Sequence, residues 1–350
     1  MSNNINNKTN FRPAGYSFLI NLYRLDVIPN WHTSAVAFSG TRSIRTSYQE
    51  TEEIFPSKYW PGDLPYNHLE FALKYDGINL AILAAVFEKI NAEEISRYIQ
   101  SKYTGKYTRR LWFLFEFLTG KKLPLKDIKQ GNYIDLLEPE KYYTVSTTTP
   151  VRRQRINNNL SGDNRFCPIV RRTDSIRRFE YANLPDKCRK ILSGYPPELL
   201  KRALGYLYNK ETRSSFEIEH VKPSSTRVER FVLLLQLAEK DDFCRKDKLI
   251  EIQNLIVDTR FKNIGYRLNQ NYIGETISRQ SERIHYVCPK PEDLPYLMDG
   301  LIAAHELMKK GNLPAVVHAA VISYGFVFLH PFEDGNGRIH RFLIDRKSVV

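Results

Sequence analysis

Twelve residues near the end of the chain, HPFEDGNGRIHR (330–341), bring two histidines, two acids, two glycines and two arginines close together. Pro331 disfavours helical geometry at the residue before it, so we expect His330 at the exit of a helix, held firmly and facing open space. Such a histidine is suited to removing a hydroxyl proton, because its pKa lies near neutrality. Glu333 or Asp334 supplies a hard carboxylate of the kind that Mg²⁺ uses beside substrate phosphates.

A Gly-Asn-Gly turn follows the two acids. Gly335 and Gly337 allow close backbone approaches that side chains would forbid, so their amides can point inward around a ligand. If a helix starts near Asn336, its unpaired N–H groups and its dipole add to an anion site. Arg338 and Arg341 then lie on one face of its first turns. This convergence predicts a site that handles phosphate groups, although no Gly-Lys-Ser/Thr follows, as it would in a Walker-type loop.

Helices are expected to position this motif. The segment 316–329 is apolar nearly all round, which is typical of a helix in the centre of a bundle. Before it, Asp293 is suited to cap a helix that ends near Gly311. Apolar residues recur at helical spacing in further segments: 67–100 with a break near Gly77, 107–118, 197–207 and 214–239. The expected fold class is therefore mainly α, with at most a short hairpin.

The composition is that of a soluble globular protein, with 42% hydrophobic and 26% charged residues. Lys and Arg outnumber Asp and Glu by 52 to 39, so the surface attracts phosphates, nucleic acid or anionic lipid, among which charge alone does not choose. The 4 cysteines have no metal-ligand spacing, which favours a reduced intracellular setting. We find no secretory signal and no apolar run long enough to span a membrane, and we expect a cytoplasmic protein.

A basic stretch, residues 143–179, holds eight arginines against two acids. It is either a nucleic-acid contact surface or a solvated basic face that links two helical lobes. Aromatic residues are sparsely interleaved with the arginines, which favours the linker. The first ten residues are polar and rich in asparagine, so we expect a disordered tail there.

The motif HPFEDGNGRIHR resembles, at every defining position, the signature HPFx[D/E]GNGRxxR of the Fic domain family, the protein AMP-transferases. This resemblance implies a Fic-type helical bundle with a short β-hairpin flap, preceded by an N-terminal helical region. It also implies that His330 deprotonates a target hydroxyl, which attacks the α-phosphate of ATP so that AMP is transferred and pyrophosphate leaves. Such a transfer demands positioning and charge neutralisation more than covalent help from the protein.

The same resemblance implies roles for the rest of the motif. Asp334 would hold Mg²⁺, and the amides of the glycine turn would form an anion hole. Glu333 falls at the variable position and is expected to face solvent. The residues implied to bind ATP are Gly335, Asn336, Gly337, Arg338 and Arg341.

The stretch ERIHYVCPKPEDLP (282–295) resembles the Fic flap, a hairpin that binds the backbone of the target as an added strand. Its apolar residues alternate as in a strand, and two prolines end the pattern. The residues expected to dock the target are Ile284, His285, Tyr286 and Val287.

The stretch ETRSSFEIEH (211–220) resembles the inhibitory helix of the family, whose pattern is [S/T]xxxE[G/N]. Ser215 and Glu219 match this pattern, while His220 departs from it. In the family the glutamate pairs with the second motif arginine, here Arg341, and displaces the γ-phosphate of ATP. A carboxylate and a phosphate accept the same bidentate hydrogen bonds, so their competition is physically sound. The same stretch contains a capping box, SSFE, which predicts the start of a helix.

Three regions are expected along the chain: a disordered tail (1–10), an N-terminal helical region with the basic linker (11–183) and a Fic domain (184–350). The chain ends nine residues after the motif. In the family the motif helix normally continues, so we expect a Fic domain truncated at its C-terminus. A helix without its packing partners frays, and truncation would therefore impair activity.

The predicted function is that of a protein adenylyltransferase that modifies a Ser, Thr or Tyr hydroxyl, with His330 as the general base and Glu219 as an inhibitor. Two alternatives stay open: removal of AMP from a modified protein, and a non-catalytic regulator that binds nucleotide or nucleic acid. The expected cofactors are ATP and Mg²⁺. The expected partner is a protein substrate, with homo-oligomer formation left open; nucleic acid is not favoured and no membrane partner is expected.

Overall fold

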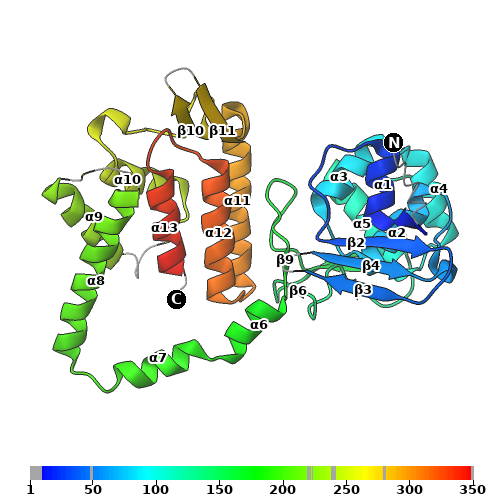
Figure 1. The fold of residues 1–350 in the computed structure, drawn as a ribbon, viewed down its shortest axis with the longest axis horizontal. Helices are drawn as coiled ribbons and strands as arrows, with labels where there is room; N and C mark the ends of the chain where they lie inside the picture. Colours follow the sequence, from blue (N-terminus) through cyan, green and yellow to red (C-terminus); the bar gives the residue numbers. More distant parts are fainter. Residues whose placement is uncertain are drawn as a thin grey trace, which may run out of the picture. The chain divides into compact units, whose positions relative to one another are not determined.

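The computed structural model describes residues 10–47, 50–218, 222, 224–237, 242–278 and 281–347 (Figure 1). Residues 1–9 of the predicted tail lie outside the described residues. The chain forms two compact units: unit 1 comprises Met1–Glu138 with Thr148–Asn159, and unit 2 comprises Pro139–Thr147 with Leu160–Val350. This division falls upstream of the predicted boundary after residue 183, because residues 139–147 and 160–183 fold into unit 2.

Unit 1 contains a four-stranded sheet of order β1-β2-β4-β3 (Figure 1). Its strands are β1 (Phe11–Ala14), β2 (His32–Ala37), β3 (Ser43–Thr46) and β4 (Thr51–Phe55). The pair β2 and β4 is parallel and the other two pairs are antiparallel. The expectation of at most a short hairpin was wrong here. The strands are short and β3 is exposed at every residue, so alternating hydrophobicity could not reveal them.

The helices of unit 1 confirm the helical spacing read from the sequence. They are α1 (Gly15–Tyr23), α2 (Pro65–Tyr75), α3 (Leu80–Lys89), α4 (Ala92–Ser101) and α5 (Lys106–Thr119), with a short 3₁₀ turn η1 (Ser57–Tyr59). The predicted break near Gly77 is present, because Gly77 has a φ of 87° and the side chain of Asn79 caps α3. Buried residues of α5, among them Trp112, belong to the core of this unit.

The basic stretch is folded rather than a solvated linker. Strands β7 (Thr149–Val151) and β8 (Ile156–Asn158) pair with each other, and β8 pairs with β5 (Ile134–Asp135). Arg153 donates hydrogen bonds to the carbonyl oxygens of Leu123 and Leu125. Arg155 donates to the carbonyl oxygens of the loop after them, at Ile128, Lys129 and Gly131. These guanidinium groups therefore stabilise a loop-rich part of unit 1.

Unit 2 is mainly helical, which confirms the predicted fold class. In chain order its elements are β6 (Tyr142–Tyr143), β9 (Val170–Arg171), α6 (Asp174–Tyr181), α7 (Leu184–Leu192), α8 (Pro197–Ile218), α9 (Ser225–Leu237), α10 (Lys246–Ile256), η2 (Thr259–Phe261), β10 (Tyr272–Ser278), β11 (Ser281–Val287), η3 (Pro291–Asp293), α11 (Leu294–Lys310), α12 (Ala315–Leu329) and α13 (Asn336–Lys347). The capping box SSFE does not begin a helix as one alternative predicted, because it lies in the last turns of α8.

The core of unit 2 surrounds α12, as the apolar run predicted. Helices α11 and α13 flank α12 (Figure 1). Ile322, Phe326 and Leu329 of α12 are almost fully buried in one cluster with Met298 of α11 and Phe342 of α13. A buried central helix fixes the position of its end, and the motif begins at that end. None of the helices among the described residues is long and apolar enough to cross a membrane.

Candidate active site

His330 ends α12 in the left-handed conformation, with a φ of 51°. Its backbone N–H still donates to the carbonyl of Phe326 at 3.0 Å, so the residue stays attached to the rigid helix. The ring atom Nδ1 lies 3.2 Å from the carbonyl oxygen of Val327. A carbonyl can only accept, so this contact assigns the proton to Nδ1, and the lone pair of the neutral imidazole is then on Nε2. The structure thus presents Nε2 as the basic atom.

Arg267 holds the backbone at His330. Its Nε donates to the carbonyl of His330 at 2.8 Å, and its own backbone N–H donates to the carbonyl of Pro331 at 2.8 Å. Its Nη2 donates to the carbonyl of Pro289 at 2.6 Å, next to the flap. The side chain is 2% exposed, and burial lowers the pKa of its guanidinium. Sequence reasoning missed Arg267, because a single arginine 63 residues before His330 has no local signature.

Asn336 and Gly335 shape the motif loop. The side chain of Asn336 accepts from the N–H of Phe332 at 3.0 Å and donates to its carbonyl at 2.7 Å, which closes the loop on itself. Gly335 has a φ of 93°, and a Cβ there would lie 2.9 Å from Cγ1 of Val257. Only glycine fits this conformation and this close approach. The side chain of Asn336 therefore positions the loop instead of pointing toward a ligand.

The sequence predicts an amide cradle at the start of α13. The first intrahelical bond joins the N–H of Ile339 to the carbonyl of Gly335 at 3.0 Å. The backbone amides of Asn336, Gly337 and Arg338 precede it and have no acceptor within the helix. Such a helix start attracts anions through these amides and through the helix dipole. The six-residue loop 330–335 thus joins the start of α13 to the exit of α12, where His330 lies.

Asp334 and Arg338 form an ion pair, with Arg338 Nη2 at 2.6 Å from Asp334 Oδ1. The N–H of Gly335 donates to the same oxygen at 2.6 Å. Arg338 is 2% exposed and also donates from Nη1 to the carbonyl of Ile256 at 2.9 Å. Arg338 was predicted to grip phosphates, whereas here its guanidinium is occupied inside the protein. Glu333 is exposed, as expected for the variable position.

The second motif arginine contacts α8. Arg341 donates from Nε to the hydroxyl of Ser215 at 2.9 Å and from Nη2 to its carbonyl oxygen at 2.9 Å. Ser215 is 4% exposed. The structure therefore brings together Ser215 and Arg341, which the resemblance had linked to inhibition. Glu219, the predicted inhibitory residue, lies outside the described residues.

The predicted flap is the hairpin of β10 and β11, whose first strand the sequence did not reveal. Ile284, His285 and Val287 of β11 are exposed. Tyr286 is different: its hydroxyl donates to the carbonyl of Phe328 at 2.9 Å, and the two rings lie 4.8 Å apart. Tyr286 thus anchors the flap to the last turn of α12, close to His330. Exposed strand edges offer backbone groups to an added strand.

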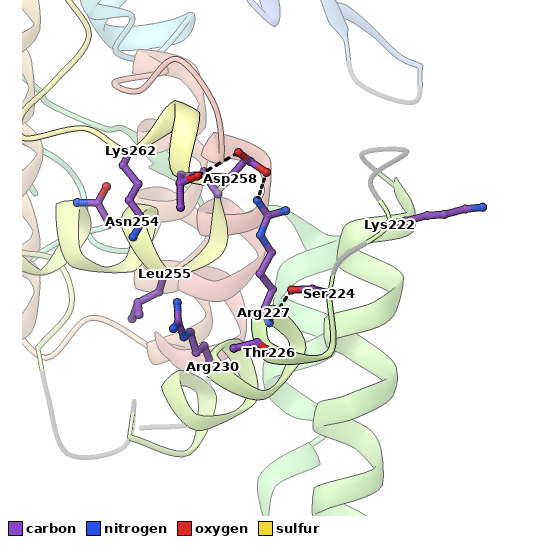
Figure 2. A pocket seen from close by; sticks show the side chains of 11 residues that line it. Lys222, Ser224, Thr226, Arg227, Arg230, Asn254, Leu255, Asp258 and Lys262 are labelled. Atoms are coloured by element: carbon purple, nitrogen blue, oxygen red, sulfur yellow. Dashed lines mark hydrogen bonds and ion pairs between the residues drawn. The ribbon is translucent and has the colours of Figure 1, made fainter.

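A basic pocket of about 370 Å³ opens between the start of α9 and the segment after α10 (Figure 2). Its charged residues are Lys222, Arg227, Arg230 and Lys262, against one acid among the described lining residues, Asp258. Arg227 Nη2 pairs with Asp258 Oδ2 at 2.8 Å. Val257 lines the pocket and also packs against Gly335, so the basic pocket adjoins the motif loop. Its excess positive charge attracts anionic ligands.

Comparisons with known proteins agree with this geometry. Residues 243–346 match the model of the Fic/DOC family. These residues contain α10 to α12, the hairpin and the whole motif. Over these residues the chain is similar to the Fic/DOC family.

Two solved structures are similar to parts of the chain. A Fic family protein from Desulfovibrio desulfuricans G20 is 19% identical, with 47% of this chain and 56% of that chain covered and a TM-score of 0.32. A Fic domain containing signaling protein from Bacteroides thetaiotaomicron VPI-5482 is 21% identical, with 45% and 68% covered and a TM-score of 0.36. The match thus spans little more than half of the Desulfovibrio protein.

Proposed function

We propose that the chain is a protein adenylyltransferase, which transfers AMP from ATP to a Ser, Thr or Tyr hydroxyl of a target protein. The observation that carries this proposal is the pairing of a base with an anion site. His330 has its lone pair on Nε2 at the end of a buried helix, and the unpaired amides of α13 begin six residues later. A base beside an anion site fits the attack of a hydroxyl on a phosphate.

In the proposed reaction His330 Nε2 takes the proton of the target hydroxyl. The hydroxyl oxygen attacks the α-phosphorus, the new O–P bond forms, and the bond to pyrophosphate breaks. The amides of Asn336, Gly337 and Arg338 stabilise the negative charge on the phosphate oxygens. Arg267 keeps His330 in place through its bond to the His330 carbonyl. A positioned base of this kind contributes roughly 10²–10⁴-fold to the rate.

Asp334 fits the role of a Mg²⁺ ligand. Its Oδ1 is used by Arg338 and by the N–H of Gly335, and a carboxylate has a second oxygen that can bind a cation. Carboxylates combined with substrate phosphates are the usual ligands of Mg²⁺. When bound, Mg²⁺ would neutralise charge on the phosphates. Arg338, which is buried, orients Asp334 in this proposal and does not contact ATP.

Arg341 and Ser215 support a built-in inhibitor at the end of α8. Arg341 is the arginine proposed to bind a terminal phosphate of ATP, and here its guanidinium donates twice to Ser215. A guanidinium held by the protein is less available to a phosphate, since both compete for the same N–H groups. We include Glu219 in this inhibitor on the resemblance alone. Activation would then require the end of α8 to release Arg341.

The flap is proposed to bind the target. Ile284, His285 and Val287 are exposed on β11, and the bond from Tyr286 to Phe328 fixes the hairpin near the end of α12. A target segment that pairs with an edge of this hairpin would pass close to His330. Main-chain pairing of this kind gives affinity for many sequences, and the exposed side chains adjust specificity.

The test is to incubate the purified chain, its Glu219→Gly variant and the Glu219→Gly/His330→Ala variant with Mg²⁺ and ATP labelled on the α-phosphate. We expect label on protein in the Glu219→Gly sample and its loss in the double variant, while ATP binding is retained. ATP labelled on the γ-phosphate serves as a control and should leave no label. Label from the γ-phosphate instead, or label that survives the loss of His330, would overturn the proposal.

A further inference from the structure

A second cluster of chemically active side chains lies in unit 2, apart from the motif. Asp242 precedes α10, and His305 and Glu306 belong to the C-terminal half of α11. The three side chains offer one ligand atom each, and these atoms all lie within 4.8 Å of one another. His318, their neighbour on α12, lies 12 residues before His330, which is about 18 Å along the helix. The proposed transfer reaction uses none of these side chains.

His305 is held in one orientation from both sides. It is fully buried, and its Nε2 lies 3.0 Å from Oδ2 of Asp242. Its Nδ1 lies 2.8 Å from Nε2 of His318, which is also buried. Histidines that bind metals are commonly fixed through the other ring nitrogen in this way, because that bond sets the tautomer and the ring orientation.

We propose that Asp242, His305 and Glu306 bind a divalent transition metal ion of the zinc type, with Nε2 of His305 as the nitrogen ligand and one oxygen from each carboxylate. Three protein ligands with an open fourth position are typical of such ions. Tetrahedral ligands about 2.1 Å from the metal lie roughly 3.4 Å apart, and the ligand atoms here already lie within 4.8 Å of one another. An imidazole ligand favours zinc, cobalt or nickel over Mg²⁺, which prefers oxygen.

Metal binding leaves the total number of protons on His305 and His318 unchanged. With no metal bound, Nε2–H of His305 donates to Asp242, and Nε2–H of His318 donates to Nδ1 of His305. When the metal binds, the proton on Nε2 of His305 is lost to solvent. The proton between the two rings then belongs to Nδ1 of His305, which donates to Nε2 of His318. His318 takes up one proton from solvent on its Nδ1 and becomes the Nδ1–H tautomer, so one proton is released and one is taken up.

Lys309 is the competitor at this site. Its Nζ lies 2.9 Å from the same Oδ2 of Asp242. Its side chain is 57% exposed, so the ammonium can leave for water when a metal ion arrives. Lys309 is four residues after His305, the spacing at which two side chains on one helix face can bind the same ion. Replacing Lys309 by histidine should therefore strengthen metal binding at this site.

The test is a titration of the metal-free, untagged full chain with Co²⁺, followed by its visible absorption, and then displacement by Zn²⁺. We expect one ion per chain, with bands typical of nitrogen and oxygen ligands. Asp242→Asn and Glu306→Gln should each raise the Kd for Zn²⁺ by about tenfold or more. Lys309→His should lower it, because a fourth ligand replaces a cation.

Asp247→Asn is the matched control, since Asp247 is exposed on α10 and pairs only with Arg245 among the contacts described for it. It should leave the Kd unchanged. The two carboxylate variants lie at the edge of the site, so they keep the test valid even if replacing the buried His305 unfolds the unit. Absence of Co²⁺ binding, equal affinity in all variants, or a thiolate charge-transfer band from cysteine would overturn the proposal. Each readout is metal binding, so the result does not depend on AMP transfer.

Discussion

Arg341 and Ser215 are joined by two hydrogen bonds across 126 residues of the chain. The bonds use Nε and Nη2 of the guanidinium, with the hydroxyl and the carbonyl oxygen of one serine as acceptors. This contact connects the last turn of α8 to the motif helix α13. A phosphate that approaches Arg341 must compete with both acceptors, so the end of α8 sets the availability of the arginine.

Ser215→Ala should therefore raise the rate of AMP transfer. The substitution removes the hydroxyl acceptor of Arg341 and leaves the carbonyl, so it weakens the contact without abolishing it. A hydrogen bond to a charged group contributes about 1.5–3 kcal/mol, which corresponds to roughly 10- to 150-fold and sets the upper limit of the increase. The measurement is the initial rate of labelling from ATP labelled on the α-phosphate. Ser214→Ala is the control, because Ser214 is exposed. Equal labelling rates for the two variants would show that Ser215 does not contribute to inhibition.

Arg267→Lys should lower kcat while ATP affinity stays close to that of the parent. Lysine keeps the charge but has a single nitrogen, so it cannot bond the carbonyls of His330, Asn269 and Pro289 together. A shift of about 1 Å in a catalytic group costs roughly 10²-fold in rate. The measurement is kcat from single-turnover labelling, with ATP binding measured separately.

Arg245→Lys serves as the comparison for Arg267→Lys, because Arg245 is 60% exposed and its contact with Asp247 lies on the surface. It should leave both kcat and ATP affinity unchanged. If Arg267→Lys reduced kcat and ATP affinity together, general damage to the fold would explain the loss, and a role in positioning His330 would be rejected.

Gly335→Ala should disrupt the motif loop. Alanine is disfavoured at this position for two reasons. The backbone has a φ of 93°, and the new Cβ would lie 2.9 Å from Cγ1 of Val257. The backbone penalty alone is about 1–2 kcal/mol for a non-glycine residue in a left-handed conformation. We expect a lower melting temperature for unit 2 and loss of AMP transfer, measured by calorimetry and labelling.

Two further variants separate the causes at Gly335. Val257→Ala combined with Gly335→Ala removes the collision and keeps the backbone penalty, so it should recover only part of the stability. Gly205→Ala in α8 is the control, since a Cβ there meets nothing within 4 Å. It should stabilise slightly, because alanine favours helix over glycine by about 1 kcal/mol. Full recovery in the double variant would show that the conformation of Gly335 is unimportant.

The parts of the site that follow from short-range rules could be predicted from the sequence. Pro331 indicated where α12 ends, and the apolar run before it indicated a central helix. The glycine turn indicated an amide cradle at a helix start. Arg267 could not be predicted, because its role depends on three carbonyl groups that meet only in the folded unit.

For Arg338 the sequence predicted a ligand contact, whereas the structure gives the side chain partners inside the protein. An arginine in a phosphate motif predicts a phosphate contact, yet this guanidinium lies 5.2 Å from the ring centre of Phe216 and bonds the carbonyl of Ile256. The sequence contains no sign that α8 and α10 would enclose it. The sheet of unit 1 was missed for a related reason. Its strands β2 and β4 pair in parallel although β3 lies between them in the sequence, and each strand is at most six residues long. Non-local pairing of short strands has no periodic signature.

Asp76 should make the stability of unit 1 fall as pH rises. The residue is fully buried and accepts hydrogen bonds from the N–H of Tyr16 and the hydroxyl of Ser34. Burial raises the pKa of Asp76 from 3.8 to about 7. The folded unit therefore binds this proton more tightly than the unfolded chain. The stabilisation is fully present below pH ~4 and is lost as pH rises through ~7, with an upper limit of about 4 kcal/mol.

Asp76→Asn should remove this pH dependence, because an amide keeps an acceptor for Tyr16 without a charge to desolvate. All three tryptophans, Trp31, Trp60 and Trp112, belong to unit 1, so urea unfolding followed by tryptophan fluorescence reports this unit alone. At pH 8 the variant should be more stable than the parent, and near pH 5 the difference should shrink. Asp26→Asn is the control at an exposed aspartate and should follow the parent at every pH. A parent whose stability instead rises between pH 5 and pH 8, with Asp76→Asn reducing that rise, would mean that Asp76 is ionised in the folded unit.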